Sequence, residues 1–193
     1  MRTATIKTIQ SHVMSIRIIK ADVSHAAIIG TIGKKSFRRA FEHLFENKED
    51  LLEYLENTYC PVKLARSLRD EDNIYLLAFI DGEPAGFVKI KKYSLNEHIE
   101  SISQMELQKI YVLGEHQGKG IGSALLNEVN KIAKEVSPDY VWLDTHISNE
   151  TAIRLYEKHG FKKMGKYYFT IGSQTFEYHI MGLPMAITMS NAY

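Results

Sequence analysis

The chain has 193 residues, 45% hydrophobic and 24% charged, which is the ordinary make-up of a globular domain with a sizeable core. Its net charge of +1 gives no electrostatic basis for nucleic acid as the main partner, and no apolar run reaches transmembrane or signal-peptide length. A single cysteine, Cys60, excludes an intrachain disulfide framework and favours a reducing cytoplasm.

The first half of the chain predicts helices followed by a hairpin. Residues 1–14 are polar and weakly patterned, so we expect an N-terminal extension outside the fold. Asp81-Gly82 is a strong hairpin signal between two apolar runs. Apolar periodicity predicts strands over 16–19, 74–80 and 84–92, and helices over about 25–41, over 49–59 and from residue 61.

The second half alternates strands and helices and then ends in two strands. Strands are predicted over 107–112, 140–144, 161–170 and 174–182, and helices from 121 and over 149–159. Gly160 is a C-terminal stop for the second of these helices. Residues 184–193 are expected to form a tail. The order of elements indicates one α/β domain over 15–183, with a mixed sheet that is antiparallel at its start and end.

The joint between the strand over 107–112 and the helix after it is rich in glycine. It reads Gln117-Gly118-Lys119-Gly120-Ile121-Gly122. Glycine weakens a helix, but here it lets an anion approach the unpaired N–H groups at the helix start. A tight turn packed on a neighbouring strand is the alternative. The glycine intervals fit neither a Walker loop nor a dinucleotide fingerprint, which disfavours a nucleotide-binding protein.

The spacing of Gln117, Gly120 and Gly122 instead resembles the coenzyme A loop of the GNAT superfamily of N-acetyltransferases. Further matches are Asp81-Gly82-x-x-x-Gly86 and Asn149-x-x-Ala152-x-x-Leu155-Tyr156-x-x-x-Gly160-Phe161. Together they span roughly residues 15–183. The resemblance implies a single-domain GNAT fold, with a mixed central sheet of about seven strands and helices on both faces.

The resemblance also implies transfer of an acetyl group from acetyl-CoA to a primary amine by direct attack. It assigns Glu106 as the base, acting on the amine directly or through a water, and Tyr156 as the acid that protonates the leaving thiolate. A surface carboxylate and a core tyrosine are the plain alternatives. The cofactor-binding residues that it implies are Ile110, Tyr111, Val112, Gln117, Gly118, Lys119, Gly120, Ile121, Gly122, Ser123 and Asn149.

The acceptor is less specified. The run from Glu49 to Leu55 resembles the bacterial Pai-type spermidine/spermine acetyltransferases, and an acidic cluster that includes Glu42, Glu46 and Glu49 suits a polyamine if it partly faces the acceptor groove. The alternatives are a protein N-terminus, an amino acid, an amino sugar, or a non-catalytic acyl-CoA-binding module. We expect a small-molecule amine as partner, no nucleic acid, no membrane, no metal because the histidines lack ligand spacing, and a homodimer as an open option.

Overall fold

The structure is a computed structural model that describes residues 14–185. The extension expected over 1–14 therefore lies outside the described residues except for Met14, and so does the expected tail apart from Pro184 and Met185. The α-helices are α1 (Ala26–Phe41), α2 (Lys48–Thr58), α3 (Pro61–Arg69), α4 (Ile121–Val136) and α5 (Glu150–Lys158). The strands are β1 (Ile16–Lys20), β2 (Asn73–Ile80), β3 (Glu83–Lys91), β4 (Gln104–Val112), β5 (Tyr140–His146), β6 (Lys162–Ile171) and β7 (Gln174–Pro184).

The strands form one seven-stranded sheet in the order β1-β2-β3-β4-β5-β7-β6. Its neighbours are antiparallel except for β4 and β5, which are parallel, so the predicted mixed α/β sheet is confirmed. The predicted hairpin turn is also present between β2 and β3. Asp81 and Gly82 there have φ values of 51° and 89°, as the primed hairpin turns require.

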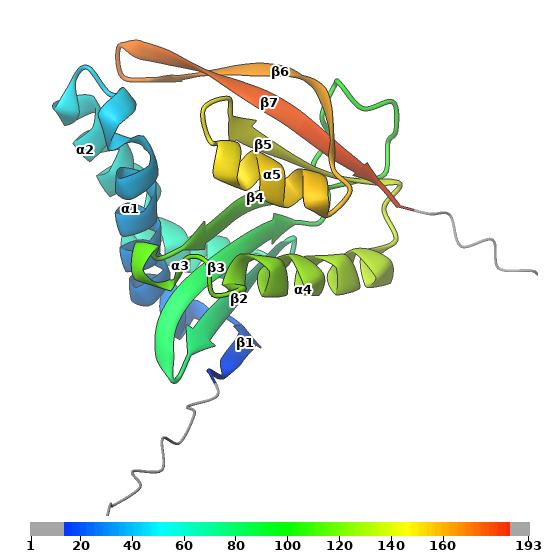
Figure 1. Cartoon of the computed structure of the whole chain (residues 1–193), viewed down its shortest axis with the longest axis horizontal. Coiled ribbons are helices and arrows are strands. Elements are labelled where there is room, and N and C mark those ends of the chain that lie inside the picture. The colour runs from blue at the N-terminus through cyan, green and yellow to red at the C-terminus, as the bar shows by residue number, and fades with distance from the viewer. Residues whose placement is uncertain (1–13, 186–193) are drawn as a thin grey trace, which may run out of the picture.

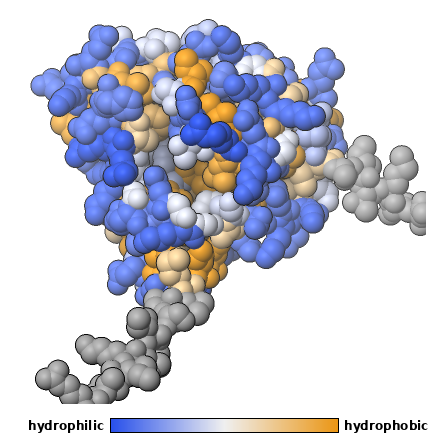
Figure 2. Space-filling view, in the orientation of Figure 1, coloured by the Kyte–Doolittle hydropathy of each residue, from blue (hydrophilic) through white to orange (hydrophobic). Residues whose placement is uncertain are grey.

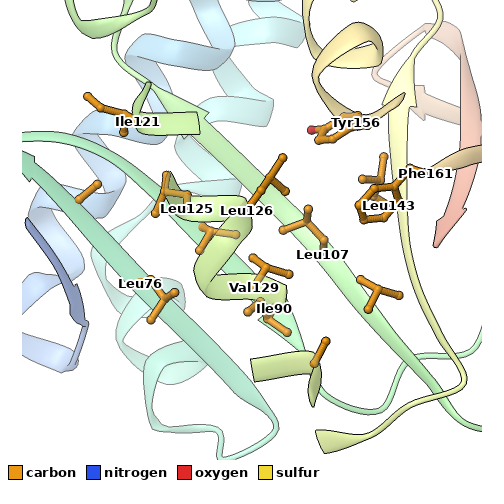
Figure 3. Packing of buried hydrophobic residues seen from close by; sticks show 14 of the residues in the cluster. Leu76, Ile90, Leu107, Ile121, Leu125, Leu126, Val129, Leu143, Tyr156 and Phe161 are labelled. Atoms are coloured by element: carbon orange, nitrogen blue, oxygen red, sulfur yellow. The ribbon is translucent and has the colours of Figure 1, made fainter. Parts of the chain in front are cut away.

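Helices cover both faces of the sheet, as expected (Figure 1). On one face, α4 and α5 pack on the sheet through a core that includes Leu125, Leu126 and Val129. Figure 3 shows this core, with the side chains of α4 pointing toward those of β4 and β5. On the other face, α1, α2 and α3 bury a second core around Ile29, Leu55 and other apolar side chains. These two cores hold the sheet rigid between them.

The parallel pair β4–β5 separates partway along its length. The two strands are paired only over Gln104–Glu106 and Tyr140–Trp142. Beyond Glu106, β4 remains paired to β3 as far as Val112, while β5 remains paired to β7. Residues past the pairing point therefore line a gap in the middle of the sheet.

Two elements differ from their predicted bounds in ways that shape this gap. Periodicity predicts that β5 ends at Asp144, but the strand continues to His146 because β7 pairs with it over that stretch. Asp144 is therefore a wall residue of the gap and not a strand end. β7 likewise continues to Pro184, one residue beyond the predicted domain boundary, opposite Tyr140.

The β6–β7 hairpin extends across the molecule toward α2 (Figure 1). At its tip, the Ser173 backbone N–H and hydroxyl both donate to the Asp50 carboxylate, each at 2.8 Å. These bonds lower the pKa of Asp50 below its ordinary value, the backbone bond having the larger effect. The hairpin and α2 thus frame one side of the gap between β4 and β5.

Candidate functional site

Two cavities meet at the gap between β4 and β5. The strand-gap cavity, of about 610 Å³, lies between β4, β5, α1, α2 and the β6–β7 hairpin. The glycine-loop cavity, of about 690 Å³, lies between the end of α1, the loop before α4, and α5. Figure 2 shows this face of the molecule hollowed near its centre, with apolar side chains around the hollow. The residues common to both cavities are Phe41, Ile110, Tyr111, Asn149 and Tyr156.

The glycine-loop cavity is shaped by backbone. Gly118 and Gly120 have φ values of +76° and +83°, in the left-handed region that favours glycine. A Cβ atom at either position would meet no atom within 4 Å, so conformation and not crowding requires glycine there. α4 begins directly after Gly120, and its unpaired N–H groups and positive dipole end border the cavity.

Basic side chains complete this cavity. Arg39 and His43 come from α1 and the turn after it, and Arg154 and Lys158 come from α5. His116 also lines the cavity, and its Nδ1 is buried without a hydrogen-bond partner among the described residues. An open cradle at a helix start, surrounded by cations, fits the phosphates of acetyl-CoA.

The structure brings most of the expected cofactor residues together. The glycine-loop cavity is lined by Ile110, Tyr111, Val112, Gln117, Gly118, Gly120, Ile121, Gly122, Ser123 and Asn149. Lys119 is exposed and does not line it. Asn149 is the N-cap of α5, where its Oδ1 accepts the Ala152 N–H at 3.3 Å. The same asparagine therefore starts α5 and faces both cavities.

Tyr156 lies where the cavities meet. Its ring packs against Phe161 in the core, with 6.0 Å between ring centroids, and Figure 3 shows its hydroxyl directed away from Phe161. Burial, and then the charge of Asp144, raise the pKa of Tyr156 well above its ordinary value. The phenol consequently keeps its proton at neutral pH, as a proton donor must.

Glu106 lines the strand-gap cavity but is largely enclosed. It is 8% exposed, and it is the last residue of β4 paired with β5. Its Oε2 accepts a hydrogen bond from the Ser94 hydroxyl at 2.7 Å and one from the Gln108 amide at 3.5 Å. The backbone carbonyl of Ser94 in turn accepts the indole N–H of Trp142 at 2.7 Å. This carboxylate is therefore held in a hydrogen-bonded corner of the cavity.

Two further charged residues lie in the same cavity, and neither was predicted from the sequence to belong to the site. Lys109 on β4 and Asp144 on β5 both line the strand-gap cavity. Burial raises the pKa of Asp144 to about 6, with Lys109 opposing the shift and Glu106 adding to it. Burial also lowers the pKa of Lys109, while Asp144 and Glu106 act in the opposite sense. A charged residue inside a buried strand is the sequence signal that could have indicated both.

The Asp144 side chain is exposed, although its carboxylate is strongly desolvated. The two observations agree once its position is considered, because the cavity reaches its side chain while protein surrounds the cavity. No hydrogen bond or ion pair within 4 Å involves its carboxylate among residues 14–185. Its oxygens are thus available to a molecule in the cavity.

Aromatic side chains form much of the remaining wall of the strand-gap cavity. They are Phe37, Phe41, Tyr54, Trp142, Tyr167, Phe169 and Tyr178. Aromatic faces attract organic cations. By contrast, Glu42, Glu46 and Glu49 are exposed and do not line this cavity. The acidic groups that line this cavity are Glu106 and Asp144, and the acidic helix surface expected beside an acceptor lies outside it.

Within the described part of the chain, no cluster of three His, Cys, Asp or Glu side chains could hold a metal ion. Among the same residues, none of the helices combines the length and apolar character needed to cross a membrane.

Comparison with known proteins identifies the family. The sequence profile of the acetyltransferase (GNAT) family matches residues 28–161. An N-alpha-acetyltransferase from Sulfurisphaera tokodaii is 30% identical over 125 residues, which cover 61% of this chain and 73% of the relative. A spermidine N(1)-acetyltransferase from Thermoplasma acidophilum is 27% identical over 153 residues, which cover 77% of this chain and 89% of the relative.

Solved structures give the same fold. The crystal structure of PaiA N-acetyltransferase from Thermoplasma acidophilum, in complex with coenzyme A, superposes with a TM-score of 0.72 at 24% identity. The match covers 89% of this chain and 99% of that one. The ribosomal-protein-S18-alanine N-acetyltransferase from Escherichia coli superposes with a TM-score of 0.66 at 21% identity, over 93% of this chain and 99% of that one. The GNAT fold expected from the sequence is confirmed.

Proposed function

The chain belongs to the acetyltransferase (GNAT) family and is an acetyl-CoA-dependent N-acetyltransferase, and we propose that its acceptor is a small primary amine, with a polyamine such as spermidine as the leading candidate. One observation carries the proposal. The glycine-loop cavity and the strand-gap cavity meet at a junction that includes Ile110 and Tyr156, so a thioester in the first and an amine in the second would come together there.

The glycine-loop cavity suits the acetyl donor. Gly118, Gly120 and the start of α4 offer backbone N–H groups to the pyrophosphate, and Arg39 and Arg154 supply positive charge nearby. Because β4 is unpaired on its β5 side beyond Glu106, its backbone N–H groups on that edge are open to the gap. We assign the donor for the developing oxyanion to this edge, at Ile110 or its neighbours Tyr111 and Val112.

The strand-gap cavity suits the acceptor. Glu106 and Asp144 supply negative charge, and the aromatic wall supplies surface that favours an ammonium group and an alkyl chain. A carboxylate of this cavity relieves the ammonium of a proton so that the nitrogen can attack, and Glu106 is the group assigned from the sequence. Tyr156 then gives its proton to the departing sulfur. Similarity to the spermidine N(1)-acetyltransferase supports a polyamine as the amine.

A second acceptor is favoured by a separate observation. The N-alpha-acetyltransferase relative acts on an α-amino group by its name, and Lys109 places a cation in the acceptor cavity, where it would oppose a polycation but tolerate a peptide backbone. The N-terminal α-amine of a peptide is therefore the alternative acceptor. Both acceptors require the same site and the same chemistry.

A thiol-release assay with acetyl-CoA separates these acceptors. The purified protein is given spermidine, spermine, an alanine-initiated peptide and glucosamine in parallel, and the products are identified by mass. We expect the highest kcat/KM with spermidine, because Glu106 and Asp144 both line the cavity and attract a polycation. If only the peptide were acetylated, the acceptor would be a peptide N-terminus and not a polyamine. Failure to acetylate any primary amine, despite bound acetyl-CoA, would contradict the proposed function.

A further inference from the structure

Two carboxylates face the acceptor cavity, and their surroundings differ. The Glu106 carboxylate is 8% exposed and accepts hydrogen bonds from Ser94 and Gln108. Asp144 is exposed on the cavity wall, and its carboxylate accepts no hydrogen bond from residues 14–185. A proton acceptor needs a free lone pair directed at the substrate. Both oxygens of Asp144 are free among these residues, whereas the Oε2 of Glu106 is already engaged twice and only its Oε1 is free.

The position of Asp144 along β5 supports the same assignment. β4 and β5 stop pairing at Glu106 and Trp142, and Asp144 lies two residues past that point, on the wall of the gap. β7 holds the backbone of Asp144 in place opposite Ile180. The carboxylate is therefore presented from a rigid strand into the cavity that also contains the junction residue Tyr156.

Charged and titratable groups surround Asp144 from several elements. Lys109 and Glu106 face it from β4, Tyr156 from α5, Tyr54 from α2 and Tyr178 from β7. Among these groups, Lys109 is the cation and favours the ionised carboxylate, whereas burial and Glu106 disfavour it. Lys109 thus keeps Asp144 ionised over part of the range in which burial alone would protonate it.

We propose that Asp144, and not Glu106, is the catalytic residue that takes the proton from the acceptor ammonium, and that Lys109 is a positioning residue that acts through it. The inference rests on the proposed function, which supplies the amine acceptor. Glu106 then serves as a fixed negative charge that helps to bind the ammonium.

The protons balance in this scheme. Asp144 takes one proton from the ammonium, and the nitrogen forms a bond to the acetyl carbonyl carbon as the carbon–sulfur bond breaks. Tyr156 gives its proton to the sulfur and regains one from the nitrogen. Asp144 finally releases its proton to water, so the products are the amide, the free thiol and one proton.

The test compares two isosteric variants, Asp144→Asn and Glu106→Gln, with spermidine as acceptor and the wild-type enzyme alongside. For Asp144→Asn we expect kcat/KM for the amine to fall about 10²–10⁴-fold at pH 7, the usual value of general base catalysis. The KM for acetyl-CoA should stay unchanged. Without Asp144, only amine that is already deprotonated in solution can react. Its fraction rises about tenfold for each pH unit, so the ratio of wild-type to variant kcat/KM should fall about tenfold for each unit as pH approaches the pKa of the amine, near 10.

Glu106→Gln should behave differently. We expect a higher KM for the amine and a pH profile that keeps an acid limb, at a pH somewhat below that of the wild type because removal of the Glu106 charge lowers the pKa of Asp144. Asp144→Asn should lack that limb. Lys109→Met should move the limb to higher pH, because removal of the cation raises the pKa of Asp144, and Lys109→Arg should restore it.

Three results would overturn the inference. Wild-type turnover in folded Asp144→Asn would remove Asp144 from the proton transfer. If Glu106→Gln lost kcat/KM for the amine and regained it at high pH, while Asp144→Asn lost none, Glu106 would be the proton acceptor. Loss of acetyl-CoA binding in Asp144→Asn, measured by titration calorimetry, would show a structural role instead. All three presuppose an active wild-type enzyme, whereas an inactive one would contradict the proposed function itself.

Discussion

One side of the glycine-loop cavity is formed by the backbone of consecutive residues at the start of α4, and side chains from α1 and α5 complete it. The strand-gap cavity is instead lined throughout by side chains from α1, α2, β4, β5, β6 and β7. The first takes its form from left-handed glycines and a helix start. The second takes its form from the separation of β4 and β5 and from the placement of the β6–β7 hairpin. The comparison indicates that the glycine loop is a local feature of the chain, while the strand-gap cavity depends throughout on tertiary structure.

The largest effect is expected at the point where the two cavities join. Tyr156→Phe keeps the ring against Phe161 and removes only the hydroxyl. We expect kcat to fall about 10²–10⁴-fold with little change in the KM for either substrate, because proton donation is a transition-state interaction. Steady-state kinetics with both substrates varied measures this. Wild-type turnover would show that Tyr156 serves the core and not the chemistry.

The donor cavity is tested by charge at the start of α4. Ser123 lies in the first turn of α4 and lines the glycine-loop cavity. Ser123→Glu should stabilise the helix, because an acidic side chain suits its N-terminus, and should weaken coenzyme A binding on the order of tenfold by repelling the phosphates. Ser123→Gln is the control of matched size. Calorimetry and thermal unfolding measure the two effects, and equal affinities of the two variants would exclude this helix start as the phosphate site.

Substitutions at Gly120 test why the glycine-loop cavity needs glycine at that position. Its φ of +83°, and the open space that a Cβ atom would enter there, indicate a conformational requirement. Gly120→Ala should cost about 1–2 kcal/mol of unfolding free energy, and Gly120→Asn should cost less despite its larger side chain, because asparagine tolerates the left-handed region. Urea unfolding gives both values. The reverse order would mean that crowding, and not φ, selects glycine.

The smallest effect is expected at the edge of the acceptor cavity. Asp50→Ala removes the carboxylate that holds Ser173 and the tip of the β6–β7 hairpin to α2. An exposed tether contributes little, so we expect the KM for the amine to rise about two- to threefold and that for acetyl-CoA to stay unchanged.

The Asp50 tether also has a defined pH dependence. Its hydrogen bonds depress the pKa of the carboxyl, so the stabilisation is present above the ordinary carboxyl pKa and is lost only as pH falls through the lower folded value. The amine KM of the wild type should thus keep this contribution throughout the neutral range. A change of the acetyl-CoA KM in Asp50→Ala would show that the hairpin frames both cavities.

The same contrast explains what the sequence could predict. Spacing and apolar periodicity predicted the order of the strands and helices, and the glycine loop predicted a cavity that Gln117, Gly120 and Gly122 do line. These features are local, so neighbouring residues determine them. Tyr156 and Glu106 both line the strand-gap cavity, but their catalytic roles come only from the family resemblance.

Other parts of the site depend on pairings between distant segments. The continuation of β5 past Asp144 depends on β7, and the separation of β4 from β5 places Lys109 and Asp144 in one cavity. Neither feature follows from periodicity within a single segment. The exposed positions of Glu42 and Glu49 likewise depend on how α1 and α2 sit on the sheet.

A crystal structure of the enzyme with coenzyme A and spermidine would show directly whether the reaction occurs where the two cavities meet. We expect the pyrophosphate at the start of α4, beside Gly120, and the sulfur between β4 and the Tyr156 hydroxyl. We also expect an amine nitrogen on the strand-gap side of that sulfur, near Asp144. A coenzyme whose sulfur lies away from Tyr156, or an amine bound on the outer surface of α1 and α2, would contradict a reaction at this junction.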